Sequence, residues 1–136
     1  TFDFLRIAGK SAENTIFASG PVMVAEEQPE TSETKAEGVA YVKAYEGKYG
    51  AGTRTQFGSH MQDAMIILKM AVPVALAKAK PGTKEFRDAL RDAIETGGPF
   101  PATHGVFQFS ATDHYGLDDR GVVLLNVKDG KFNLVK

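Results

Sequence analysis

The chain has 136 residues, 43% of them hydrophobic, which is enough for one or two compact units with a buried core. Its 16 basic and 17 acidic side chains give a formal charge of −1, so no charge excess points to nucleic acid or to an anionic membrane. Cysteine is absent, which excludes disulfides, thiolate metal sites and a cysteine nucleophile.

The N-terminal part predicts one strand followed by a surface segment. Residues 15–19 (TIFAS) are β-branched and aromatic and precede the turn signal Gly20-Pro21, so they predict a strand that residues 22–24 could extend. Residues 26–34 are acidic and polar and predict an exposed connection. The chain begins without an initiator Met or a signal peptide, and we expect it to be the cut end of something longer.

Two helices follow in the predicted order. Thr34 and Glu37 have the spacing of a capping box and predict a helix that the glycines of residues 47–52 end. Ser59 is the expected N-cap of a second helix, which runs to about residue 80. Pro73 lies inside this second helix, and we expect it to kink or restart the helix because proline removes a backbone donor.

A third helix has the clearest pattern. Pro81-Gly82 stops the preceding helix, and Thr83 is the expected N-cap of the next one. Gly97-Gly98-Pro99 then ends this helix. An apolar stripe at helical spacing predicts its buried face: Phe86, Ala89, Leu90, Ala93 and Ile94.

The last third reads as strands around a polar loop. Residues 106–109 are apolar and aromatic, and residues 122–127 are almost unbroken Val and Leu, which predicts a strand buried on both faces. Asp129-Gly130 predicts a type I′ turn into a final strand at residues 131–135. The whole pattern predicts an α/β chain with too few strands to cover three helices, so we expect a part to be missing on the N-terminal side.

Two kinds of chemical site are tested against the sequence and set aside. The glycines at 47, 50 and 52 follow a helix instead of opening one, so they predict a helix stop and no phosphate loop. His60, His104 and His114 lie in separate segments without i,i+4 pairing, so no metal site is expected and no cofactor is indicated.

A hydrolase remains the alternative enzymatic interpretation. Asp113, His114 and Asp118 could supply a base and an orienting carboxylate, with Ser19 or Ser110 as nucleophile. No GxSxG elbow surrounds either serine. Asp and His in a glycine-containing loop more often fix the turn, so no catalytic residue is predicted.

The whole chain resembles the periplasmic substrate-binding proteins of ABC transporters, in the Leu/Ile/Val-binding class. Four stretches carry the resemblance: LRIAGKSAENTIFASGP, FGSHMQDAMIILKMAVPVALAKAKPGT, EFRDALRDAIE, and THGVFQFSATDHYGLDD followed by VKDGKFNLV. AVPVALAKAKPGT together with TDHYGLD is most similar to the subgroup serving aromatic acids and other small carboxylates.

The resemblance implies the C-terminal portion of a two-lobed, doubly wound fold that is incomplete on its own. Residues 1–51 and 103–136 would belong to the second lobe and residues 54–98 to the first. Hinge crossings are then expected near residues 52–56 and 99–104.

The same resemblance implies where a ligand would bind. The residues expected to reach the interlobe cleft follow the first crossing: Phe57, Gly58, Ser59, His60 and Met61. Phe57 would offer an apolar face and Ser59 a hydrogen bond, although Phe57 could equally be core and Ser59 is already explained as an N-cap. Many relatives carry Tyr where this chain has Gln62.

The implied function is that of a periplasmic solute receptor without enzymatic activity. It would bind a branched-chain amino acid or an aromatic or small carboxylate, close its lobes and present the solute to a membrane permease. A third interpretation is a truncated chain without ligand competence. Its exposed helix faces at residues 59–96 would then be buried against another copy, giving a homodimer or an exchanged-segment assembly.

Overall fold

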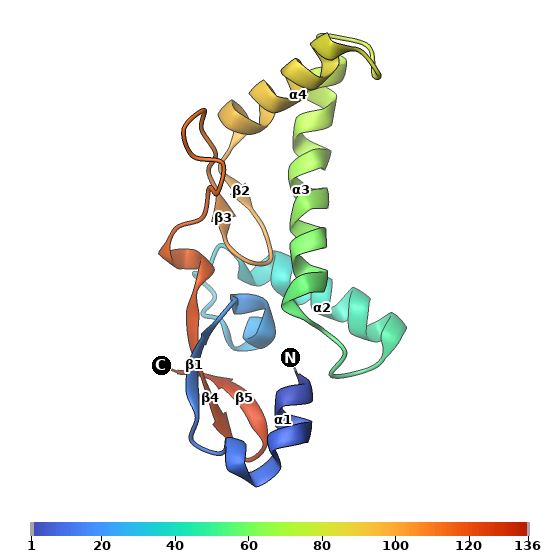
Figure 1. Ribbon diagram of the computed structural model, residues 1–136. Coiled ribbons are helices and arrows are strands. Elements are labelled where there is room, and N and C mark those ends of the chain that lie inside the picture. The colour runs from blue at the N-terminus through green and yellow to red at the C-terminus, as the bar shows by residue number, and fades with distance from the viewer. Residues whose placement is uncertain (1, 136) are drawn as a thin grey trace.

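The computed structural model describes residues 2–135 and shows a mixed α/β chain, as the sequence predicts. Figure 1 shows the larger sheet and the N-terminal helices in the lower half of the molecule, with the later helices above them. The elements follow in this order: α1 Phe2–Ala8, β1 Ile16–Ser19, α2 Lys35–Tyr49, α3 Gln56–Leu76, α4 Lys84–Gly97, β2 Phe100–Pro101, β3 Val106–Phe107, β4 Val123–Lys128 and β5 Lys131–Leu134.

The sheet is antiparallel, with strand order β1-β4-β5. Asp129 and Gly130 join β4 to β5 with φ values of 54° and 68°, which confirms the predicted two-residue turn. The Glu13 carboxylate accepts hydrogen bonds from both turn amides, over 3.1 Å from Asp129 N and 2.6 Å from Gly130 N. This contact joins the N-terminal segment to the hairpin at the far end of the sequence.

Burial on both faces was the expectation for β4, and it is wrong. Leu125 and Val127 are buried, whereas Leu124 between them is 52% exposed. Ile16 of β1 is also exposed. The run of Val and Leu therefore alternates like a strand with one covered face, because the described helices pack against one side of the sheet only.

Residues 22–24 do not extend β1. Pro21–Glu27 form 3-10 turns in which Val22, Met23 and Val24 are all buried. Pro21 occupies the first position, where its fixed φ suits a helical turn. This compact turn buries three consecutive apolar side chains, which a one-faced strand could not do.

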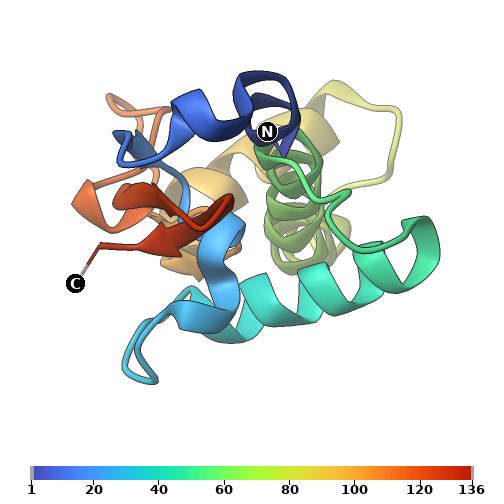
Figure 2. The ribbon, with the colours of Figure 1, turned by 90° about the horizontal axis from the view of Figure 1, so that it is seen from below.

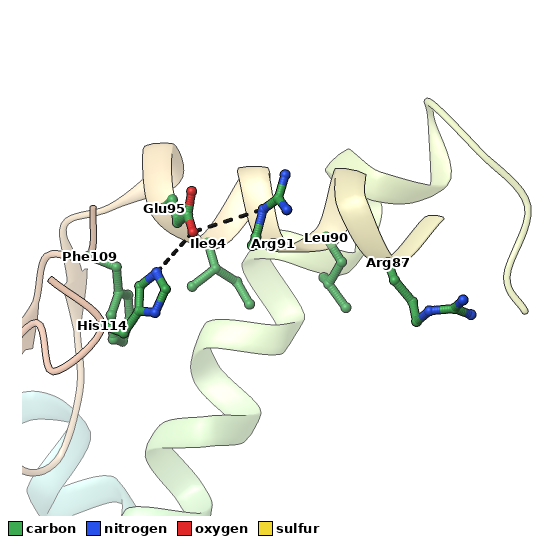
Figure 3. Close-up of a pocket in the computed structure, with 7 residues that line it drawn as sticks. All are labelled: Arg87, Leu90, Arg91, Ile94, Glu95, Phe109 and His114. Carbon is green, nitrogen blue, oxygen red and sulfur yellow. Dashed lines mark hydrogen bonds and ion pairs between the residues drawn. The ribbon is translucent and has the colours of Figure 1, made fainter. Parts of the chain in front are cut away.

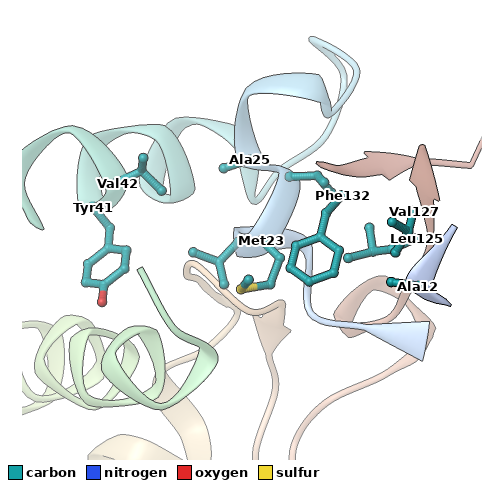
Figure 4. Close-up of a cluster of buried hydrophobic side chains, with 10 residues drawn as sticks. Ala12, Met23, Ala25, Tyr41, Val42, Leu125, Val127 and Phe132 are labelled. Atoms are coloured by element: carbon teal, nitrogen blue, oxygen red, sulfur yellow. The ribbon is translucent and has the colours of Figure 1, made fainter. Parts of the chain in front are cut away.

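Two hydrophobic clusters hold the chain together. The first joins the sheet to the 3-10 turns and α2, and Figure 4 shows its members, with Val42 on α2, Met23 in the 3-10 turns and Phe132 on β5. The second joins α3 and α4 to the β2–β3 pair through Ile67, Phe100, Ala102 and Phe107. Each cluster draws on segments far apart in sequence, so the chain passes repeatedly from one cluster to the other.

Helix starts agree only partly with the predicted caps. Thr83 caps α4, since its Oγ1 accepts from Phe86 N over 3.2 Å. The cap of α3 is Thr55, whose Oγ1 accepts from Gly58 N over 3.1 Å, so the prediction of Ser59 as N-cap is wrong. At α2 the Thr34 side chain caps nothing and instead lies 3.0 Å from Ser32 Oγ, so the capping box is wrong too.

Helix α3 is a single helix of 21 residues that includes Pro73, so the predicted restart does not occur. Figure 2 looks nearly along this helix and shows α2 running across it. One face of α3 is buried: Ser59, Asp63, Ile67, Ala71 and Ala75. A second apolar stripe lies at least 36% exposed, which we call the outer stripe: Phe57, Met61, Met65, Leu68 and Leu76.

Helix α3 is therefore apolar on two faces and covered on one. This agrees with a fold that is incomplete by itself. Among residues 2–135, no helix is both long and apolar enough to cross a membrane.

Candidate functional site

A cavity of about 490 Å³ lies where the chain passes between the two clusters, and we call it the junction cavity. Its walls come from the end of β1, the first turns of α3, the segment before β3 and the loop before β4. Both predicted crossings contribute to it, with Gln56 from the first and His104 from the second. A site built this way changes shape if the two clusters move relative to each other.

The cavity combines apolar walls with a few polar groups. Phe107 and Leu117 are apolar wall residues, and Tyr115 lies at an exposed position. The Gln56 amide donates a hydrogen bond from Nε2 to Ser19 Oγ, which ties α3 to the end of β1. Apolar walls with a small number of oriented polar groups are typical of small-molecule sites.

Two histidines from distant segments meet at this cavity. The His60 and His104 rings have centroids 4.0 Å apart and an interplanar angle of 33°. His60 is exposed on α3, whereas His104 is only 7% exposed. Burial, and secondarily the neighbouring His60, lowers the pKa of His104 to about 4, so its imidazole is neutral near pH 7.

The position of His104 depends on a glycine. A Cβ on Gly20 would stand 2.2 Å from His104 Cε1 and 2.4 Å from its Nε2, so the ring lies flat against the Gly20 backbone. Glycine is needed at position 20 because a side chain would collide with the ring; the φ of −73° is one that any residue can adopt without strain. On its other side, His104 Nδ1 lies 3.4 Å from Ser59 Oγ.

Asp63 is a buried carboxylate behind the histidine pair. It is 2% exposed, and its Oδ1 accepts hydrogen bonds from Thr103 N over 2.7 Å and from Thr103 Oγ1 over 2.6 Å. Its Oδ2 is buried and has no hydrogen-bond partner. Burial raises the pKa of Asp63, although the Thr103 hydrogen bonds oppose that rise.

Of the residues predicted to reach the cleft, only His60 lines the junction cavity. Phe57 and Met61 are 75% and 69% exposed on the outer stripe. Gly58 lies against the Tyr41 hydroxyl, which would be 2.3 Å from an added Cβ. Ser59 is fully buried and donates from Oγ to the Gln56 carbonyl over 2.8 Å.

The groups of the hydrolase interpretation do not assemble into a catalytic arrangement. Asp113 Oδ1 accepts from the Tyr115 and Gly116 amides, as in a structural turn. His114 Nε2 lies 3.0 Å from Glu95 Oε1, and Asp118 is paired with Arg120. Ser110 Oγ accepts from the Asp113 amide over 3.0 Å. Each group is used in a local contact.

A second pocket of about 380 Å³ lies between α4 and the segment that carries Phe109 and His114 (Figure 3). Leu90, Ile94 and Phe109 give it an apolar lining, with Arg87 and Arg91 at its edge. In Figure 3, His114 points toward Glu95 at one end of this pocket. Because it draws on the second cluster alone, it lacks the position between clusters that distinguishes the junction cavity.

Sequence reasoning missed the polar groups Gln56, Asp63 and His104, and it missed the wall residues Phe107, Tyr115 and Leu117 as well. His60 and Asp63 are three residues apart on a predicted helix, which places them on one face, and this spacing was available as a signal. His104 lies 44 positions from His60, and no local pattern indicates that these two rings come into contact. Only the packing of the two clusters brings them together.

Comparison with known proteins relates the whole chain to binding receptors. An extracellular ligand-binding receptor from Rhodopseudomonas palustris is 56% identical, with a TM-score of 0.94, and the match covers 100% of this chain and 38% of that one. Another, from Rhodopseudomonas palustris HaA2, is 51% identical with a TM-score of 0.95 over the same shares. No protein-family model and no curated protein matches.

A more distant structure shares the fold alone. A putative branched-chain amino acid ABC transporter from Rhodospirillum rubrum is 24% identical, with a TM-score of 0.65, over 99% of this chain and 34% of its own length. These matches confirm the resemblance to the binding-protein class, and the coverage is consistent with the expected C-terminal portion. The neighbours are binding receptors and not enzymes.

Proposed function

We propose that this chain supplies part of the solute site of a ligand-binding receptor, and that this site is the junction cavity. Over its whole length the chain corresponds to about 38% of a similar extracellular ligand-binding receptor. The observation that carries the proposal is the position of the cavity, between two hydrophobic clusters joined by several crossings of the chain. A solute held there would contact both clusters and would favour their closed arrangement.

The lining suits a small solute with an apolar body and one polar end. Phe107 and Leu117 would face the apolar part. Gln56 and His60 carry N–H donors that a carboxylate could accept from. We therefore propose an aromatic or other small carboxylate, or a branched-chain amino acid, as the solute, and a periplasmic receptor that passes it to an ABC permease.

The test is solute binding by the full-length receptor. Benzoate, leucine and valine would be titrated by calorimetry and by thermal shift, and at least one is expected to bind without being turned over. Gln56→Ala and Tyr115→Ala should weaken that binding, because both side chains line the junction cavity.

Phe57→Ala is the matched control, since Phe57 lies on the same helix turn as Gln56 but outside the cavity. A large loss with Phe57→Ala and none with Gln56→Ala or Tyr115→Ala would place the site on the outer stripe and contradict the proposal. Loss of solute uptake in cells lacking the receptor, restored by the wild-type gene, would test the permease step.

A further inference from the structure

We propose that His60, Asp63 and His104 form a binding site for a divalent transition-metal ion of the zinc class beside the junction cavity. One donor atom from each of the three side chains lies within 4.8 Å of the others. Two donors come from successive turns of α3 and the third from the segment between β2 and β3. The site would therefore join the helix to a crossing segment.

The buried oxygen of Asp63 is the observation that points to a cation. Asp63 Oδ1 is satisfied by Thr103, whereas Oδ2 is buried and makes no well-formed hydrogen bond, although the backbone N–H of His104 lies near the carboxylate. A buried carboxylate oxygen without a partner is costly, and a bound cation would remove that cost. The histidine rings are the groups that share this cluster with it.

The donor set selects the class of ion. Two imidazoles and one carboxylate are ligands that zinc accepts, and this set leaves a fourth position open. Magnesium and calcium prefer oxygen ligands throughout, so two imidazoles disfavour them.

The geometry requires a small adjustment that the burial pattern permits. With bonds of about 2.1 Å, a tetrahedral ion would bring its ligand atoms to about 3.4 Å from one another. Thr103 fixes Asp63, and Gly20 and Ser59 fix the ring of His104. His60 is exposed, so its side chain can rotate toward the other two at low cost.

The arrangement also supplies the outer contacts that metal sites use. Ligands are usually oriented by hydrogen bonds from a second layer of groups, and here Thr103 donates to Asp63 while Ser59 adjoins His104. Because His60 and His104 also line the junction cavity, the open fourth position would be reached from that cavity. Water or a ligand oxygen could occupy it.

The experiment is a metal titration of the full chain after removal of metal by a chelator. Zn²⁺ binding would be followed by calorimetry, and Co²⁺ binding by the visible absorption of a tetrahedral complex. We expect one ion per chain, a rise in melting temperature with Zn²⁺, and no comparable rise with Ca²⁺. No solute is present, so this result is independent of the proposed solute site.

Three variants locate the ion. His60→Gln and Asp63→Asn should each weaken Zn²⁺ binding at least about tenfold. His114→Gln is the matched control, because His114 lines the same cavity but lies outside the cluster, and its Zn²⁺ binding should equal that of the wild type. Far-ultraviolet circular dichroism would establish that each variant is folded.

If Asp63→Asn does not fold, the Zn²⁺ affinity of His60→Gln alone tests the proposal, since the side chain of His60 is exposed and its replacement should not unfold the chain. The proposal is overturned if the wild-type chain binds no Zn²⁺ at micromolar concentrations. Undiminished binding by His60→Gln, or a loss confined to His114→Gln, would overturn it equally.

Discussion

Arg54 donates from Nε to Glu46 Oε1 over 2.8 Å, and this pair anchors the segment that leads from α2 into α3. The same guanidinium contacts Glu26 Oε2 from Nη1 over 2.6 Å. Hydrogen bonds from Arg54 lower the pKa of both Glu26 and Glu46. One side chain thus fixes the first crossing to the 3-10 turns and to α2.

We expect Arg54→Met to lower the free energy of unfolding by about 2 kcal/mol, because it leaves two neighbouring carboxylates without their cation. Chemical denaturation near pH 7 measures this loss.

Since both carboxyl pKa values are lowered in the folded state, the stabilisation is present above their ordinary value of 4.5 and is lost as the pH falls below it. Arg91→Met is the control, since Arg91 pairs with Asp92 at an exposed position where solvent screens the charges, and it should change stability much less than Arg54→Met. Equal losses in the two variants would contradict this account.

His104 should make the chain sensitive to mild acid. Its pKa is about 4 in the folded state and near 6.5 when unfolded, so the unfolded chain binds more protons between these values. The contribution of His104 to the free energy of unfolding is fully present above pH 6.5, and up to about 3 kcal/mol of it is lost as the pH drops to 4. The raised pKa of Asp63 acts in the opposite direction, so the comparison must be made against a variant.

Denaturation curves at a series of pH values, with wild type and His104→Gln side by side, isolate the histidine. The variant should lose less stability than the wild type over the same interval. If both curves decline in parallel, another group is responsible for the acid sensitivity.

Gly20→Ala should displace the His104 ring. The added methyl group would meet Cε1 at 2.2 Å, so either the ring or the backbone must move, at a cost of about 1–3 kcal/mol. Gly47→Ala is a matched control, because Gly47 lies within α2 and nothing stands within 4 Å of an added Cβ. That substitution should stabilise the chain by about 0.5–1 kcal/mol through helix propensity. Thermal melts that fail to separate the two variants would contradict the close packing of Gly20 and His104.

The outer stripe of α3 should make the isolated 136-residue chain prone to self-association. We expect it to bind a hydrophobic dye and to self-associate, and the double variant Met61→Gln, Met65→Gln should reduce both, because these side chains are 69% and 49% exposed. Light scattering measures the association, with Lys78→Gln as a control at an exposed polar position. A wild-type chain that is monomeric at high concentration would count against this prediction and against the expected homodimer.

Local signals in the sequence predict most of the elements and few of the contacts. The Asp129-Gly130 turn and the Thr83 cap are confirmed because each depends on residues that touch within one turn of chain. Helix α1 was not predicted. Ser59 was misassigned because Thr55, four positions earlier, has an equally good capping side chain, and only the backbone decides between them.

The candidate site was harder to predict for a physical reason. His60 and Asp63 share a helix face, which the sequence shows, but His104 reaches them through the packing of the second cluster. Phe57 and Met61 are predicted to reach the ligand because they follow the first crossing. They lie exposed on the outer stripe and do not line the junction cavity, and their contact with a ligand stays a prediction. A helix places neighbouring residues about 100° apart, so proximity in sequence does not place residues on one face.

The two apolar faces of α3 have different surroundings in this chain. Its buried face packs in a core formed by this chain, whereas its outer stripe is exposed here and would be available to segments of a longer receptor. Substitutions on the outer stripe should therefore leave the stability of the isolated chain unchanged or raise it, and should lower the stability, but not the solute affinity, of a longer receptor that covers this stripe. The same residue would be scored as surface in one context and as interior in the other, so mutational tolerance measured on this piece cannot be transferred to its parent along that face.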